Sequence, residues 1–100
     1  MTKPEKLQVS AAEWQIIAAI LSLVEECEVW AFGSRTKGEA RQYSDLDLGL
    51  IGQGPISHQQ LAQLREAFTE SDLCWTVDLV DYQLAGPTIQ QAIKQGIRLR

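Results

Sequence analysis

Two aspartates, Asp45 and Asp47, interrupt a run of hydrophobic residues in the middle of this chain of 100 residues. The run over residues 46–51 predicts a strand, in which residues two positions apart face the same side. The two carboxylates therefore project together, while the leucines beside them face the core. An ionised carboxylate inside a strand is costly unless it has a partner, and the nearest cations lie upstream in a loop. We infer that the partner of this pair is not part of the chain.

A divalent cation is the partner that this pair of carboxylates favours. Two ionised carboxylates close together repel each other, and oxygen-only ligands suit Mg²⁺, which also accepts oxygens from phosphates. A later apolar segment, residues 74–80, carries a third acid, Asp78. The sequence therefore predicts that Asp45, Asp47 and Asp78 are the catalytic, metal-ligating residues of a site for two Mg²⁺ ions. Asp81 is expected to cap the end of the later strand instead.

A Gly-Ser pair precedes these acids at the end of another expected strand. Gly33 follows the apolar run of residues 28–32 and permits a close backbone approach. Ser34 opens a helical turn whose free N–H groups and hydroxyl can hold an anion. A strand, a Gly-Ser turn and a D-x-D pair in the neighbouring strand place a triphosphate beside its metals. This arrangement indicates phosphoryl or nucleotidyl transfer, in which catalysis is mostly positioning and charge neutralisation.

Each of these residues also has a purely structural interpretation. Asp45 could only begin a strand, Asp78 could lie on an exposed strand edge, and the Gly-Ser pair could only end a strand and cap a helix. The combination of the motifs at this spacing favours the chemical interpretation. His58, which follows a helix-capping serine, is expected to be a surface residue.

Hydrophobic periodicity predicts one α/β domain over residues 1–100, with the element order α-β-β-α-β-α. The expected helices cover residues 11–25, residues 58–69 and the segment from Pro87 to near Gly96, and the expected strands cover residues 28–32, 46–51 and 74–80. Capping boxes begin the first two helices at Ser10 and Ser57. Residues 1–9 are polar and expected to be flexible. The expected fold is a small mixed sheet with the helices packed on one side.

Several hydrophobic residues have an expected place in this fold. Ile89, Ala92 and Ile93 should form the inner face of the last helix. Trp14, Trp30 and Trp75 should lie in the core or at an interface, where aromatic residues are enriched. Cys27 and Cys74 lack the C-x-x-C spacing of a metal or redox site, so both are expected to be buried, reduced thiols.

The composition restricts the classes of function. A net charge of −4 with scattered cations argues against extended binding to nucleic acid, which needs a basic surface. No apolar run approaches the ~18 residues of a membrane span, and the first residues lack the apolar segment of a signal peptide. We therefore expect a cytoplasmic domain. Because a domain of this size is only marginally stable alone, a permanent partner or a homo-oligomer is plausible.

The pattern G-S-x10-D-x-D, here Gly33-Ser34 to Asp45-Leu46-Asp47, resembles that of the DNA-polymerase-β-like nucleotidyltransferase superfamily. The short chain is similar to its smallest branch, the minimal nucleotidyltransferases (MNT proteins), and the element order agrees over nearly the whole chain. The resemblance implies the nucleotidyltransferase fold. It also implies that Gly33 and Ser34 bind the β and γ phosphates, that the D-x-D pair ligates both metal ions, and that Asp78 completes the second metal and helps to activate the acceptor hydroxyl.

The same resemblance assigns further residues to the nucleotide. Arg35 and Lys37 would contribute positive charge, although Lys37 stands where arginine is common and lacks the bidentate geometry of a guanidinium. Ser44, directly before the D-x-D pair, is also expected to contact the nucleotide. Tyr43 could touch a base or merely pack.

The resemblance also implies a partner. Larger relatives carry a helical domain that grips the acceptor, whereas this chain ends at Arg100, so the acceptor is expected on another chain. Minimal nucleotidyltransferases are typically paired with a HEPN-domain toxin and add AMP to one of its tyrosines. The implied function is therefore Mg²⁺-dependent transfer of AMP from ATP to a HEPN toxin, with this chain as the antitoxin. The alternatives are an antitoxin that acts by binding alone and, less favoured, a nucleotidyltransferase for small molecules.

Overall fold

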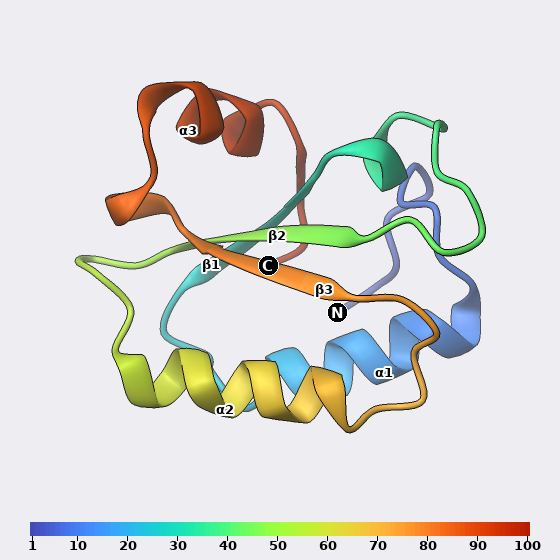
Figure 1. The fold of residues 1–100 in the computed structure, drawn as a ribbon, viewed down its shortest axis with the longest axis horizontal. Coiled ribbons are helices and arrows are strands. Elements are labelled where there is room, and N and C mark those ends of the chain that lie inside the picture. Colours follow the sequence, from blue (N-terminus) through green and yellow to red (C-terminus); the bar gives the residue numbers. More distant parts are fainter.

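In the computed structural model, which describes residues 1–100, a four-stranded mixed sheet is packed between helices (Figure 1). The elements in chain order are α1 (Ala11–Leu21), β1 (Glu28–Phe32), the 3₁₀ turn η1 (Ser34–Thr36), β2 (Leu46–Ile51), α2 (His58–Thr69), β3 (Val77–Asp81), the 3₁₀ turn η2 (Tyr82–Leu84), α3 (Pro87–Lys94) and β4 (Ile97–Arg98). The strands lie in the order β3-β2-β1-β4, so β3 is an edge strand. It pairs with β2 in parallel, and the other pairs are antiparallel.

The expected order of elements is confirmed, with the short strand β4 added. The strands β1 and β2 and the helix α2 have the expected bounds. The strand β3 begins three residues later than expected, at Val77, because the chain turns at Trp75 and places that indole in the core at 8% exposure. Asp81 closes β3 as expected, and its carboxylate accepts hydrogen bonds from the N–H groups of Ile56 (2.8 Å) and Gln83 (3.0 Å).

The helices α1 and α2 cover one face of the sheet, and α3 lies on the other (Figure 1). This differs from the expected packing on one side. Leu46, Leu48 and Leu50 of β2 are fully buried under α1 and α2, whereas Gly49 between them faces Ile93 of α3. A Cβ on Gly49 would lie 2.7 Å from three carbons of Ile93. The absence of a side chain at residue 49 therefore allows α3 to pack on this face of the sheet.

Only part of the expected inner face of α3 is buried. Ile93 is 0% exposed, but Ile89 is 42% exposed near the start of the helix. The helix α3 has eight residues and packs over Gly49 through Ile93 in its second half, whereas Ile89 lies one turn earlier.

The N-terminal segment is packed, which differs from the expected flexibility. Leu7 is 1% exposed and belongs to the hydrophobic core. The N–H of Gln8 donates to the carbonyl of Arg35 over 2.8 Å, and its side-chain amide bonds both backbone groups of Ala40. The segment therefore lies against the loop between β1 and β2.

The helix α1 ends at Leu21, four residues before the expected end. The guanidinium of Arg100 donates to the carbonyls of Leu21 (2.7 Å), Val24 and Cys27 (3.1 Å) beyond it. A cation therefore meets the negative end of the helix dipole, and it comes from a residue distant in the sequence. Burial raises the pKa of the Cys27 thiol. Both cysteines are free, but Cys74 is exposed rather than buried as expected.

Each of the three helices lacks the combination of length and apolar character that crossing a bilayer requires.

Candidate active site

Gly33 joins the two halves of the predicted site. Its φ of +86° lies in the region that favours glycine. A Cβ at this position would also collide with the Oδ2 atom of Asp47 and lie 3.4 Å from its Cγ. The cause is the register of the sheet, in which Phe32, the residue before Gly33, pairs with Asp47. The Gly-Ser turn and the D-x-D strand are therefore in direct contact, as the sequence predicts.

The turn after Gly33 is held by Thr36. The N–H and the hydroxyl of Thr36 both donate to the Gly33 carbonyl, over 3.1 Å and 2.7 Å. The N–H groups of Lys37 and Glu39 donate to the Ser34 carbonyl over 3.2 Å. These bonds fix Ser34 directly beside the glycine. Contacts of Gly33 and Ser34 with phosphates remain a prediction.

Asp47 and Asp78 are neighbours across the parallel pair of β2 and β3. Asp47 is half-buried, and Asp78 is exposed on the edge strand. Burial raises the pKa of the Asp47 carboxyl, and the charges of Asp78 and Asp45 and a hydrogen bond with Asp78 raise it further. The repulsion between these acids is the kind that a bound cation relieves. The donor set therefore fits a hard divalent cation.

The three acids do not form a closed cage with their side chains as they stand. No group of three or more histidine, cysteine, aspartate or glutamate side chains is close enough to hold a metal ion. Asp45 lies immediately before β2 and is exposed, whereas Asp47 and Asp78 lie on strands. The structure thus shows an acidic pair with a third acid nearby, and metal binding by all three remains a prediction.

Arg35 is buried and bonds groups of the protein itself, so its predicted contact with the nucleotide stays a prediction. Its side chain is 5% exposed and lies 4.2 Å from the ring centroid of Trp75. Its guanidinium donates to the carbonyls of Ser44 (2.9 Å), Gln8 (2.8 Å) and Gln42 (3.3 Å). A cation enclosed by three carbonyls and an indole is directed into the protein. Arg35 therefore supports the loop before Asp45 instead of facing the solvent.

Trp75 and Glu13 extend this support and were not singled out as site residues from the sequence. The Trp75 indole N–H donates to Glu13 Oε2 over 3.2 Å, while Glu13 Oε1 accepts from the Ser10 N–H in the capping box of α1. Trp75 also lies three residues before Asp78. The sequence predicted only that Trp75 lies in the core or at an interface, and no local pattern indicated its contact with Glu13.

The other two residues predicted to bind the nucleotide lie at the border of the site. The Ser44 hydroxyl accepts from the N–H of Arg41 over 2.8 Å, which closes the loop before β2. Lys37 is exposed and ends the 3₁₀ turn. Tyr43 is 67% exposed on the same loop. Contacts of Ser44 and Lys37 with a nucleotide stay predictions.

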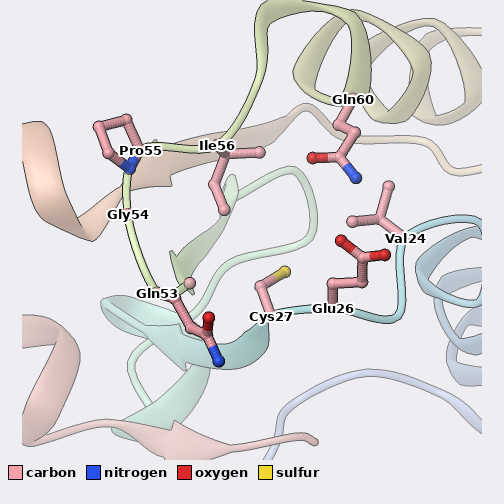
Figure 2. Close-up of a pocket in the computed structure, with 9 residues that line it drawn as sticks. Val24, Glu26, Cys27, Gln53, Gly54, Pro55, Ile56 and Gln60 are labelled. Atoms are coloured by element: carbon pink, nitrogen blue, oxygen red, sulfur yellow. The ribbon is translucent and has the colours of Figure 1, made fainter.

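The acidic pair opens into a groove of about 740 Å³ that follows the edge strand β3. Asp47 and Asp78 lie in this groove beside apolar side chains of β3 and α3. Another cavity, of about 380 Å³, lies between the end of α1 and the loop before α2 (Figure 2). There the Cys27 thiol and the Glu26 carboxylate face Ile56 and Gln60. This second cavity contains none of the predicted catalytic acids.

Comparisons with known proteins agree with this geometry. A family model described as polymerase beta, nucleotidyltransferase matches residues 15–100. The probable protein adenylyltransferase MntA of Haemophilus influenzae is 43% identical over 96 residues, which cover 95% of this chain and 84% of that protein.

Solved structures have the same fold. A toxin–antitoxin crystallised with AMP-PNP matches 86% of this chain and 71% of its own, with a TM-score of 0.70 and 25% identity. The MntA-HepT toxin–antitoxin matches 91% of this chain and 72% of its own, with a TM-score of 0.64 and 20% identity. The second likeness concerns the fold alone.

Proposed function

Since the chain belongs to the polymerase beta nucleotidyltransferase family, we propose that it is a protein adenylyltransferase. It transfers AMP from ATP to a hydroxyl, most simply that of a tyrosine, on a cognate HEPN-class toxin and so acts as the antitoxin. One observation carries the chemistry: Asp47 packs against Gly33 of the phosphate turn and pairs with Asp78 on the next strand. The similarity to a probable protein adenylyltransferase supports a protein acceptor.

In this proposal Gly33 and Ser34 hold the β and γ phosphates, and Asp45, Asp47 and Asp78 hold two Mg²⁺ ions. Bound Mg²⁺ would neutralise the phosphates and favour the ionised acceptor. The acceptor oxygen forms a bond to the α phosphorus, while the bond from that phosphorus to the bridging oxygen of pyrophosphate breaks. The acceptor proton passes to Asp78, and pyrophosphate leaves on the side of Gly33.

The partner follows from the relatives. A toxin–antitoxin with AMP-PNP and the MntA-HepT pair share the fold of this chain. We therefore assign the acceptor to a HEPN-class protein that this chain binds as a hetero-oligomer, and we keep the cytoplasm as the expected location of both.

Incubation with ATP labelled on the α phosphate, Mg²⁺ and the cognate HEPN protein tests the proposal. Label should appear on the HEPN protein. Asp47→Asn and Asp78→Asn should each lower the rate at least about 100-fold, the scale of losing one transition-state contact. Asp72→Asn, an exposed aspartate in the turn after α2, is the matched control and should transfer normally. Absence of label with the wild-type protein would refute the enzymatic proposal.

An antitoxin that acts by binding alone is the second candidate. The observation that favours it is the open arrangement of the acids, which do not form a three-ligand metal group. Toxicity assays with the double variant Asp45→Asn, Asp47→Asn separate the two functions. Neutralisation that survives the double change supports binding alone, and neutralisation that is lost while the complex still forms supports catalysis.

A further inference from the structure

The order of strands in the sheet gives the reaction a direction. The Gly-Ser turn follows β1, Asp45 immediately precedes β2, Asp47 lies on β2, and Asp78 lies on β3 at the edge. Displacement at phosphorus is in line, so the attacking and leaving oxygens lie on opposite sides of the α phosphorus. If pyrophosphate leaves on the β1 side, beside Gly33, the acceptor must arrive from the β3 side.

A groove is present on that side. It has a volume of about 740 Å³ and follows β3. The strand β3 itself lies between α2 and α3 (Figure 1). Val77 lines it from the face of β3 that meets α2, whereas Asp78 and Val80 line it from the face that meets α3. The groove therefore passes around an edge strand that has no neighbour on its outer side.

The side chains of the groove combine an apolar wall with charges of both signs. Ile89, 42% exposed at the start of α3, and Val80 form the apolar part beside Asp78. Arg65 of α2 lines the side of the groove away from Ile89 and Val80, and it makes no salt bridge. An exposed isoleucine and an unpaired arginine in the same groove as the acidic pair suit a protein segment better than a small polar acceptor.

We infer that this groove is the docking site for the acceptor segment of the partner protein. The segment places its hydroxyl residue at Asp78, packs an apolar or aromatic side chain against Ile89 and Val80, and presents a carboxylate to Arg65. The inference rests on the proposed function and adds the surface that selects the acceptor. It assigns acceptor recognition to α2, β3 and α3 and nucleotide binding to the turn after β1.

Two variants test the docking site, with affinity and kinetics measured on the full chain. Ile89→Asp places a charge on the apolar wall, and Arg65→Glu reverses the free cation. Leu23→Asp is the matched control, because Leu23 is 49% exposed and lies outside the groove, after α1. The probes are the cognate HEPN protein and ATP with Mg²⁺, each titrated separately by calorimetry and then varied in the transfer assay.

Ile89→Asp and Arg65→Glu should each raise the Kd and the KM for the HEPN protein at least tenfold, while the KM for ATP stays within about twofold. Arg65→Lys should retain most of the affinity, because the charge is kept. Leu23→Asp should behave as the wild type in every measurement.

Three results would overturn the inference. A rise in the KM for ATP with unchanged partner affinity would assign the groove to the nucleotide. Dimers of the wild-type chain that are lost in Ile89→Asp would assign it to a second copy. Unchanged affinity for the HEPN protein in both Ile89→Asp and Arg65→Glu would show that the groove does not recognise the acceptor. Because the calorimetric titration with the HEPN protein needs no catalysis, it decides the docking question even if the wild-type protein transfers no AMP.

Discussion

At the scale of single residues, the site depends on one missing side chain. Gly33 has a positive φ, and the space where its Cβ would stand is filled by the Asp47 carboxylate. The Gly-Ser turn can therefore approach the acid only because residue 33 is glycine. The raised pKa of Asp47 has a related origin, since the same crowding that brings the acids together disfavours their ionisation.

Gly33→Ala tests both the backbone conformation of Gly33, whose φ of +86° and ψ of −160° are nearly restricted to glycine, and its contact with Asp47. Gly38 provides the control, because its φ is +69° but no atom lies within 4 Å of the position of its Cβ. Gly38→Ala should cost about 1 kcal/mol of unfolding free energy from strain alone. Gly33→Ala should cost about 1 kcal/mol more and lower AMP transfer at least tenfold. Urea unfolding and the transfer assay measure both effects, and equal activity of the two variants would contradict the assigned contact.

The raised pKa of Asp47 predicts a pH dependence of stability in the absence of metal. The folded protein holds this proton more tightly than the unfolded chain, so stability falls as pH rises from the unfolded pKa through the folded pKa, and the loss is complete above the folded pKa. Asp47→Asn removes this pH-dependent loss of stability, because the amide does not titrate. In EDTA at neutral pH the variant should therefore be more stable than the wild type, by on the order of 0.5 kcal/mol after solvent screening at a half-exposed site.

Urea unfolding of both proteins near pH 7 and near pH 4 provides the measurement. The advantage of Asp47→Asn should shrink at the acidic pH, because a larger share of the wild-type carboxyl holds its proton there. A constant difference between the two pH values would show that the carboxyl is not perturbed by its neighbours.

At the scale of elements, the loop between β1 and β2 owes its shape to groups distant in the sequence. Arg35 bonds the carbonyl of Gln8 in the N-terminal segment and the carbonyl of Ser44 before β2. Its stacking on Trp75 connects the loop to the segment that enters β3. One buried guanidinium thus fixes the turn with Ser34, the approach to Asp45 and the approach to Asp78.

Arg35→Lys should therefore be far from conservative. A lysine ammonium cannot reproduce the planar set of donors, so carbonyls in a buried site lose their partners. The expected loss of unfolding free energy is about 2 kcal/mol, the scale of hydrogen bonds to a charged group. Arg41→Lys in the same loop, with an exposed side chain, should change stability by less than about 0.5 kcal/mol. Equal stability of both variants would contradict the structural role of Arg35.

These contacts show which parts of the fold can be predicted from the sequence. Periodicity and capping identified β1, β2 and α2, because their determinants are local. The role of Arg35 and the packing of the N-terminal segment depend on contacts between residues up to 62 positions apart, such as Glu13 with Trp75. The face of the sheet on which α3 packs could likewise not be predicted from the local sequence of α3. It depends on the absence of a side chain at Gly49 in β2.

At the scale of the whole molecule, we expect the acidic face to take its stabilising partner from outside the chain. Asp47 and Asp78 repel each other across two strands that the rest of the sheet holds together. A ligand that binds only the folded state stabilises it by RT ln(1 + [L]/Kd), about 2.7 kcal/mol at a hundredfold excess over Kd. Mg²⁺ with a non-hydrolysable ATP analogue at this excess should therefore raise the melting temperature of the wild-type protein by at least about 10 °C, since about 1 kcal/mol shifts a domain of this size by ~4–8 °C.

The same additions should have much smaller effects on Asp47→Asn, which keeps the fold but lacks the central carboxylate. The melting temperatures of the wild type and Asp47→Asn should converge as ligand is added. The variant has the higher melting temperature in EDTA, and the wild type gains more stability from Mg²⁺ and nucleotide. Thermal unfolding followed by circular dichroism, with Asp72→Asn as the control, measures this convergence. Equal shifts for the wild type and Asp47→Asn would place the metal and the triphosphate away from the acidic pair, and the direction of attack along β1, β2 and β3 would lose its basis.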